Sequence, residues 1–138
     1  MPASPSYYVS PTILIGAVDF SSLCSEATIT AGFDTTEITA FGDAGHVEAS
    51  TLKSVEISAK FFGTYGTGEL EEALYNALGD GTTTVTLYPN GASPTTSNPE
   101  WEVTNTMLKV FTPVNAKVGE IVTFDVTFTS GTWARSTS

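Results

Sequence analysis

The sequence predicts a mainly β fold, a β-sandwich or partly open barrel of about seven strands with one short flanking helix. Thr, Ser, Val and Phe are abundant, and this composition favours strands over helices. Several segments alternate apolar with polar residues, which is the period of a strand with one buried face and one solvated face. Strands and helices do not alternate along the chain, so nothing requires a parallel sheet.

Length and composition predict one domain. The 138 residues match the size of an ordinary domain, and 41% hydrophobic against 14% charged residues excludes a highly charged disordered chain. Cys24 is the only cysteine, so stability must come from packing or association rather than from an internal disulfide. No apolar run of about eighteen residues is present, and the N-terminus lacks the layout of a secretion signal. We therefore expect a single domain over residues 1–138 and no membrane partner.

The first third of the chain predicts an arm, two strands and a loop. Residues 1–12 hold three prolines among Ser and Ala and are expected to form an N-terminal arm. Residues 13–20 form a short apolar strand, and residues 26–33 alternate as a second strand. Residues 35–41 either continue that strand or pair back on it. Residues 41–53 are expected to form an extended loop.

The middle of the chain predicts a strand followed by the helix. Apolar residues alternate with polar ones from Val55 to Phe61, which indicates a two-sided strand. The pattern then changes to the spacing of one apolar helical stripe, which predicts a short helix near residues 68–78; its members are Leu70, Ala73, Leu74, Ala77 and Leu78. Gly79 fits the left-handed residue that ends a helix. We expect this helix to pack on a sheet that contains both of its flanking strands.

The last third of the chain predicts three more strands and a second arm. TTTVTLYP (82–89) is a strand candidate that alternates over residues 84–88, and the following stretch to residue 99 has the Pro, Gly and Asn content of a loop. Residues 101–111 form a strand with a bulge, because its apolar residues change phase near Leu108 and Val110. Residues 121–129 show the clearest alternation, and residues 130–138 are expected to form a polar arm.

Charge and motifs argue against catalysis and nucleic-acid binding. Fifteen acidic residues against five basic ones give a net charge of −10, whereas capture of a phosphate backbone needs clustered Lys and Arg. His46 is the only histidine, it lies in the expected loop, and no G-x-S-x-G motif accompanies it. A loop histidine without catalytic function is the simpler interpretation.

Two groups of acidic residues are further candidate sites. Asp43, His46 and Glu48 could be metal ligands, but one His without Cys lacks the spacing of zinc motifs. Glu100 and Glu102 flank Trp101, as a sugar-cleaving pair beside a stacking platform could, yet strand rims commonly carry solvated acids. We expect a protein that is not an enzyme, with no catalytic residues, no metal and no cofactor.

The polar faces of the strongest strands are short and acidic. Their members are Glu26, Thr28 and Thr30; Ser54, Glu56 and Ser58; and Thr123, Asp125, Thr127 and Thr129, with Lys60 as the main exception. A solvated face is the simplest explanation, because antiparallel sheets normally have one.

Five segments together resemble the tail tube, or major tail, proteins of long-tailed bacteriophages, particularly those that infect actinobacteria. They are VDFS (18–21), FGDAGH (41–46), TLKSVEISAKFF (51–62), TLYPNG (86–91) and VGEIVTFDVTFTSGTWARSTS (118–138). The likeness covers most of the chain and consists of patterns rather than a catalytic signature. It implies a β-sandwich with one flanking helix, whose copies close into hexameric rings that stack as a tube.

The resemblance also implies a function and partners. The protein would be a structural virion protein, made in the bacterial host cytoplasm and located in the tail, with tape measure and terminator proteins as further partners. DNA would only pass through, since a lining of Thr, Ser, Glu and Asp releases no counterions from phosphates. The residues that would face the lumen are Glu26, Thr28, Glu56, Ser58, Thr123, Asp125 and Thr127.

By the same resemblance, the loop at 41–53 and the two terminal arms would lie between stacked rings. The residues that would make these contacts are Tyr7, Tyr8, Phe41, Asp43, His46 and Trp133. Two alternatives stay open. The chain could be a β-sandwich binding module that decorates a capsid or binds carbohydrate through Trp101, Tyr88 and the following loop. A hydrolase would rest on His46 or on the Glu100 and Glu102 pair.

Overall fold

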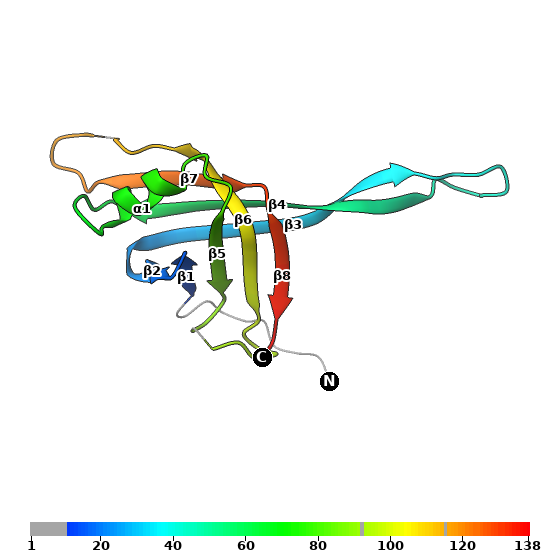
Figure 1. The fold of residues 1–138 in the computed structure, drawn as a ribbon, viewed down its shortest axis with the longest axis horizontal. Helices are drawn as coiled ribbons and strands as arrows, with labels where there is room; N and C mark the ends of the chain where they lie inside the picture. Colours follow the sequence, from blue (N-terminus) through cyan, green and yellow to red (C-terminus); the bar gives the residue numbers. More distant parts are fainter. Residues whose placement is uncertain (1–10, 92, 115) are drawn as a thin grey trace.

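The computed structural model describes residues 11–91, 93–114 and 116–138, and its elements are shown in Figure 1. In chain order these are β1 (Thr12–Ile15), β2 (Val18–Asp19), the 3-10 helix η1 (Ser21–Leu23), β3 (Cys24–Glu37), β4 (Glu48–Phe62), α1 (Leu70–Ala77), β5 (Thr83–Tyr88), β6 (Glu100–Phe111), β7 (Thr123–Thr129) and β8 (Thr132–Ser136). The mainly β prediction with one short helix is confirmed, with eight strands rather than about seven.

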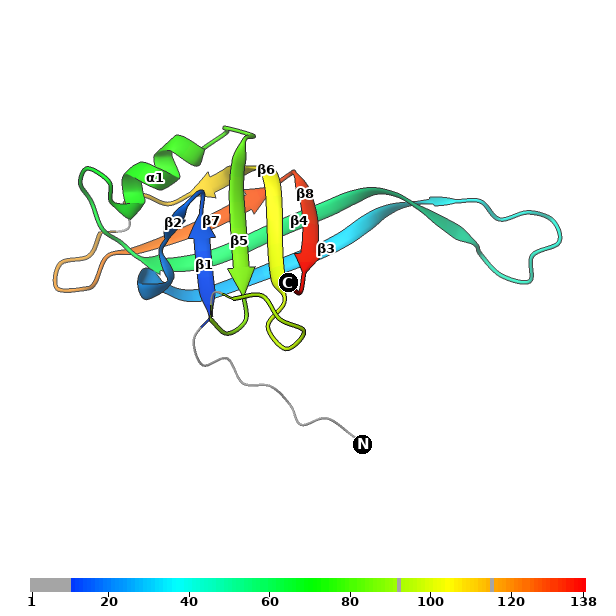
Figure 2. The same ribbon diagram turned by 60° about the horizontal axis from the view of Figure 1, so that its bottom comes forward.

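The strands form one antiparallel sheet that folds over on itself. Its order is β2-β1-β5-β6-β7-β4-β3, and β8 pairs with β6 beside this path. The first half of β6 pairs with β5 and β8, whereas its second half pairs with β7. The sheet therefore has two layers, which we name layer A (β2, β1, β5, the first half of β6, and β8) and layer B (the second half of β6, β7, β4 and β3). Figure 2 shows the strands of the two layers crossing at a wide angle.

The passage between layers occurs where the backbone leaves the strand region. Asn105, in the middle of β6, has a φ of +56°, and Ser130 and Gly131, between β7 and β8, have φ values of +72° and +98°. β6 thus bends at Asn105, and the chain bends at Ser130 and Gly131 as it passes from β7 to β8. β7 pairs with the second half of β6, and β8 pairs with its first half. At Gly131 a Cβ would lie 2.3 Å from the carbonyl oxygen of Thr104, so only glycine lets the chain pass this closely.

The core lies between the layers and follows the predicted alternation. On β4 the side chains of Val55, Ile57, Ala59 and Phe61 are buried, while the polar residues between them are exposed. Phe124, Val126 and Phe128 of β7 are buried in the same way. These residues join one continuous apolar cluster with Ile13, Ile15, Phe20, Leu70, Leu74, Ala77, Val85, Val103 and Leu108. One buried face per strand explains why the sequence alternates there.

The helix lies at one end of the two layers (Figure 2). Its buried residues are Leu70, Leu74 and Ala77, and Gly79 follows with a φ of +70° and donates a hydrogen bond to the carbonyl of Leu108. Both strands that flank the helix belong to the one eight-stranded sheet, as expected. Within it, β4 lies in layer B and β5 in layer A, so the helix connects the two layers. In the described part of the chain, no helix is long and apolar enough to cross a membrane.

The longest feature is the hairpin of β3 and β4, which projects far beyond the body (Figure 1). Pairing extends from Cys24 opposite Phe61 to Glu37 opposite Glu48. The loop at the tip is residues 38–47, so residues 48–53, expected as loop, are strand. We name residues 33–53 the distal hairpin.

Two more boundaries differ from the expectations. The single strand expected at residues 13–20 is two short strands, β1 and β2, joined by a turn at Gly16, whose φ is +65°. The polar arm expected at residues 130–138 contains β8, because Thr132–Ser136 pairs along the first half of β6. Of the expected N-terminal arm, Thr12 is buried in β1, and residues 1–10 lie outside the described residues.

Candidate functional site

The outer face of layer B collects the polar residues that the alternation singled out. Strand pairing aligns them in three rows across β3, β4 and β7: Glu26, Lys60 and Asp125; Thr28, Ser58 and Thr127; and Thr30, Glu56 and Thr129. Thr123 extends this face opposite Phe62. All the residues expected to face a lumen therefore lie on one surface, which we name the polar face.

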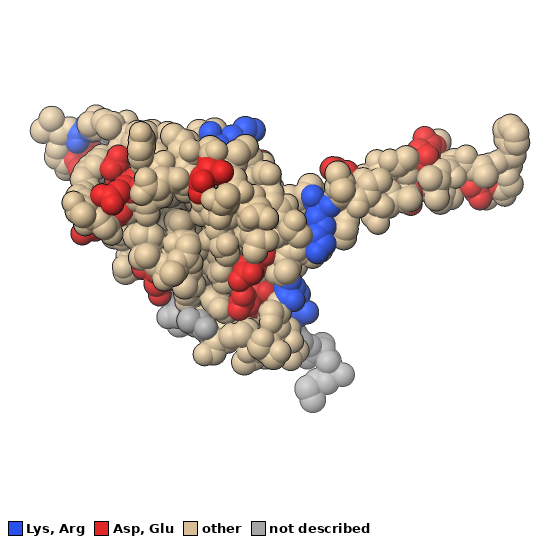
Figure 3. Space-filling model, in the orientation of Figure 1, with Lys and Arg blue, Asp and Glu red and all other residues tan. Residues whose placement is uncertain are grey.

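The polar face is less acidic than the sequence suggested. Lys60 lies in one row between Glu26 and Asp125, so its ammonium offsets part of their charge. Acidic side chains elsewhere are dispersed, as Figure 3 shows for one side of the body and for the projecting hairpin. The polar face consequently presents mostly neutral Thr and Ser side chains, with Glu26, Glu56, Asp125 and Lys60 among them.

A free strand edge borders the polar face. β3 is 14 residues long and, among the described strands, pairs only with β4. Its other edge therefore exposes backbone N–H and C=O groups, which invite pairing with another chain unless they are covered. An edge of this length beside a smooth face is a suitable surface for association between copies.

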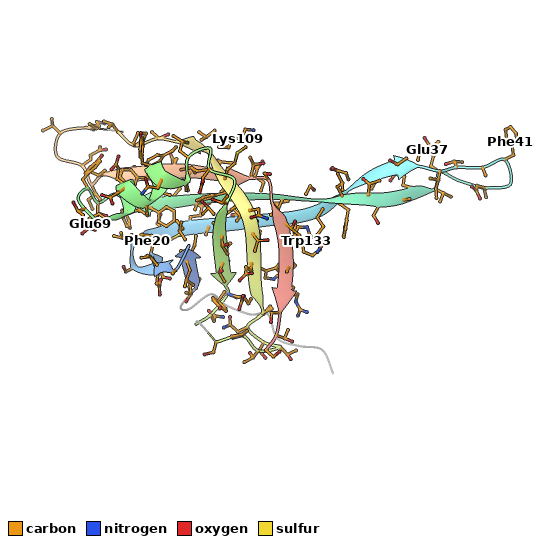
Figure 4. All side chains as sticks on the ribbon, viewed as in Figure 1. Phe20, Glu37, Phe41, Glu69, Lys109 and Trp133 are labelled. Atoms are coloured by element: carbon orange, nitrogen blue, oxygen red, sulfur yellow. The ribbon has the colours of Figure 1, made fainter. Side chains whose placement is uncertain are left out.

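The tip of the distal hairpin holds three of the residues expected between rings. Phe41 is fully exposed at the end of the molecule, and Glu37 lies nearby at the end of β3 (Figure 4). The Asp43 carboxylate accepts a hydrogen bond of 2.7 Å from the backbone N–H of Ala40, and His46 Nδ1 lies 2.6 Å from Glu37 Oε1. These contacts order the loop around Phe41. The tip therefore offers an apolar side chain within an acidic and polar surround.

Trp133 belongs to the same prediction but lies away from the tip, whereas Tyr7 and Tyr8 are outside the described residues. Trp133 is half-buried in β8 at the base of the distal hairpin (Figure 4), where its indole Nε1 donates a hydrogen bond of 3.1 Å to the carbonyl of Gly32. Sequence reasoning missed this contact because the two residues are 101 positions apart.

The alternative catalytic groupings do not assemble. His46 contacts Glu37, and the described residues contain no group of three His, Cys, Asp or Glu side chains placed to hold a metal. Burial raises the pKa of the Cys24 thiol, which disfavours a nucleophilic thiolate at neutral pH. Neither the contact of His46 with Glu37 nor the Cys24 thiol therefore combines a nucleophile with a base.

The carboxylates beside Trp101 point away from its ring. Strand alternation puts Glu100 and Glu102 on the face of layer A opposite to Trp101. Tyr88 donates a hydrogen bond of 2.9 Å to Glu100, and partial burial together with this bond raises the pKa of the Tyr88 phenol. Trp101 instead lines a groove of about 860 Å³ between β3 and layer A, with Leu87, Ile29 and Cys24. Glu100 and Glu102 therefore do not form the acid pair beside a stacking ring that the hydrolase alternative requires.

No protein-family model matches the sequence, and no curated protein matches it. Solved structures share its fold. A chain in the cryo-EM structure of the anti-feeding prophage cap, the AFP tube terminating cap, matches with a TM-score of 0.70 and 14% identity, over 100% of this chain and 95% of that chain. A chain in the sheath/tube terminator of an extracellular contractile injection system, PVC, in its extended state, matches with a TM-score of 0.69 and 14% identity, over 97% and 98%.

A third match comes from another kind of particle. A chain in the tail of an empty GTA particle, refined helically with C6 symmetry, matches with a TM-score of 0.59 and 13% identity, over 84% of this chain and 82% of that chain. At these identities the likeness shows a common fold. This chain thus has the fold of chains found in tail and tube-terminating assemblies.

Proposed function

We propose that this protein is a structural subunit of a phage-type tail, which associates with copies of itself into hexameric rings that stack as a tube around a channel for DNA. The observation that carries the proposal is the match of nearly the whole chain to chains of tail and tube-terminating assemblies. Because one fold can serve many functions, the surfaces of this chain must also suit the proposal. Three of them do.

The free edge of β3 suits ring closure. In a ring, this edge pairs with a strand of the neighbouring copy, which covers its exposed backbone groups. Such an interface joins two different surfaces, so it closes into a ring when the rotation between copies permits. The C6 symmetry of the GTA tail supports six copies as the proposed number.

The polar face suits a channel lining. Its Thr and Ser side chains carry no positive charge, and Glu26 and Asp125 stand on either side of Lys60. Affinity for DNA depends on lysine and arginine displacing counterions from the phosphates, so this lining holds the polymer weakly and lets it slide. In the proposed tube this face, with Glu56 and Ser58 near its centre, points into the bore.

The distal hairpin suits contacts between rings. It carries Phe41 well away from the body, where it can reach a copy in the next ring (Figure 1). Tape measure and terminator proteins are the further partners that we propose, with a location in the virion tail and synthesis in the bacterial host cytoplasm. Structural work of this kind requires no catalytic group or cofactor.

Self-assembly is the first prediction. Concentrated purified protein should form rings or filaments of constant diameter, visible by negative-stain electron microscopy, with six-fold symmetry in end-on class averages. Sedimentation should show the same material at high mass. A protein that stays monomeric at high concentration, under crowding and in moderate salt, would contradict the proposal.

The charge of the lining is the second prediction. Changing Glu56 and Asp125 to Lys should leave tubes intact but retain DNA in the channel, so the infectious titre of a phage carrying the variant should fall roughly tenfold or more. The matched control changes Glu69 and Glu72, beside and in α1, to Lys, which alters net charge equally away from the polar face. Equal titres for both variants would remove the electrostatic argument for the lining.

The groove beside Trp101 favours one alternative. A volume of about 860 Å³ lined by apolar and polar groups is of the size that takes a small ligand, so a binding module that decorates a virion is the second candidate. Binding of a glycan by the monomer on an array, lost on Trp101→Ala, would favour it. Tube formation without glycan binding would favour the tail subunit.

A further inference from the structure

The distal hairpin is supported by few neighbours for its length. β7 pairs with β4 only over Glu56–Phe62, and β3 pairs with β4 alone in the described chain. From Val55 to the hairpin tip, the sheet therefore consists of β3 and β4 alone. An isolated two-stranded ribbon of this kind is at best marginally stable. Yet it leaves the body as a continuous, extended ribbon in both views (Figures 1 and 2). Its direction must be determined at its base.

Trp133 contacts both strands of the ribbon at that base. Phe33 and Lys53 are direct cross-strand partners. The Phe33 and Trp133 rings meet edge to face, with centroids 5.5 Å apart at an interplanar angle of 74°. The Lys53 ammonium lies 4.4 Å from the Trp133 ring centroid, within range of a cation–π interaction. One indole thus touches a residue of β3 and its partner on β4.

Two hydrogen bonds give these contacts a defined geometry. The indole Nε1 donates to the carbonyl of Gly32 at 3.1 Å, and Lys53 Nζ donates to the carbonyl of Trp133 at 3.0 Å. Ring contacts alone would allow the indole to slide along the two strands. Directional hydrogen bonds to Gly32 of β3 and from Lys53 of β4 limit this movement. Trp133 is therefore bonded to β3 through its side chain and to β4 through its backbone.

Trp133 is itself held by layer A. It pairs with Val103 of β6, and its ring lies 5.8 Å from that of Trp101, centroid to centroid. The contacts of Trp133 consequently connect layer A to the ribbon of layer B. They occur immediately before the register shift between Phe33 and Thr35, and such irregularities bend and twist a strand. The ribbon is thus held where its path begins to change.

We propose that Trp133 is a positioning residue, which together with Phe33 and Lys53 sets the direction of the distal hairpin and keeps its strands paired. Its relevance to ring stacking rests on the proposed function. The positioning itself is a property of one subunit and can be measured without any tube.

The test is hydrogen exchange measured by mass spectrometry on the full chain. Lys53→Met keeps the aliphatic stem of an exposed residue but removes the ammonium, and Trp133→Leu removes the ring. Both should raise amide exchange in peptides covering residues 33–37 and 48–53 by roughly tenfold or more, with β7 peptides unchanged. Trp133→Phe, which keeps an aromatic ring but lacks Nε1, should show a smaller rise.

The matched control is Trp101→Leu. It removes a tryptophan that contacts Trp133, whereas the ring contacts with Phe33 and Lys53 belong to Trp133 itself. Amide exchange should rise in layer A, and the rise in the distal hairpin should be smaller than for Trp133→Leu. Unchanged exchange in the distal hairpin of Lys53→Met and Trp133→Leu, or an equal rise over the whole chain, would overturn the proposal. A selective rise in a protein that forms no tubes would support the positioning role and contradict the tube.

Discussion

Replacing Gly131 with alanine is expected to lower the free energy of unfolding by about 3 to 5 kcal/mol. Gly131 has a φ of +98°, which strains any side chain, and an added Cβ would meet the carbonyl oxygen of Thr104 at 2.3 Å. The oxygen belongs to the backbone of β6 and cannot move without disturbing the pairing with β8. Denaturant unfolding followed by tryptophan fluorescence measures the loss.

Gly81→Ala is the matched control for Gly131→Ala. Gly81 also has a positive φ, +75°, but a Cβ there would meet nothing within 4 Å. Its substitution should therefore show the backbone strain alone, about 1 kcal/mol. Losses of similar size at the two positions would mean that the close passage of β7 and β8 along β6 is not what requires glycine at residue 131.

Replacing Phe41 with serine is expected to abolish filaments at concentrations where the unchanged protein forms them. An exposed aromatic residue that becomes buried in an interface commonly contributes about 2 kcal/mol, which raises the concentration needed for assembly roughly thirtyfold. The stability of the subunit should change by less than about 0.5 kcal/mol, because Phe41 is fully exposed at the hairpin tip. Sedimentation over a concentration series, with thermal unfolding of the dilute protein, measures both quantities.

Val118→Ser provides the comparison for Phe41→Ser. Val118 is also fully exposed and apolar, but it lies in the connection between β6 and β7 rather than on the hairpin. If stacking depends on the hairpin tip, Val118→Ser should assemble much better than Phe41→Ser. Equal loss of assembly would indicate that exposed apolar surface acts without a specific contact at Phe41.

Where one face of an element is buried, the sequence was sufficient to predict the element. Val55 to Phe61 and Phe124 to Phe128 alternate because every second residue enters the core. The helix showed its stripe for the same reason, with Leu70 and Leu74 fully buried. The phase change in β6 also marked a real bulge, since the register shifts between Leu108 and Val110.

In residues 48–53 and in β8 neither face is deeply buried, and the expectations for these two segments were wrong. Residues 48–53 are strand, yet most of their side chains are exposed. Because neither side of this segment enters the core, its apolar and polar residues do not alternate. The prediction for β8 was wrong for a related reason. Its five residues are short and mostly polar, and the strand exists because β6 offers it an edge. Hydrophobic periodicity reports burial, and these segments are paired without being deeply buried.

The candidate site divides in the same way. Strand parity in the sequence identified the polar face, because residues two apart share a side of the strand. Only tertiary structure aligned Glu26 with Lys60 and Asp125, since register depends on strands that are distant in sequence. The channel role of that face and the inter-ring role of Phe41 stay predictions.

By itself, the sequence determined the mainly β class, the short α-helix and the sides of β4 and β7 that meet solvent, because these follow from local periodicity. The tertiary structure alone decided the division into two layers, the length and direction of the distal hairpin and the position of Trp133. Those features depend on pairing and packing between residues as far apart as Gly32 and Trp133, and no local pattern encodes which distant partner a residue will meet.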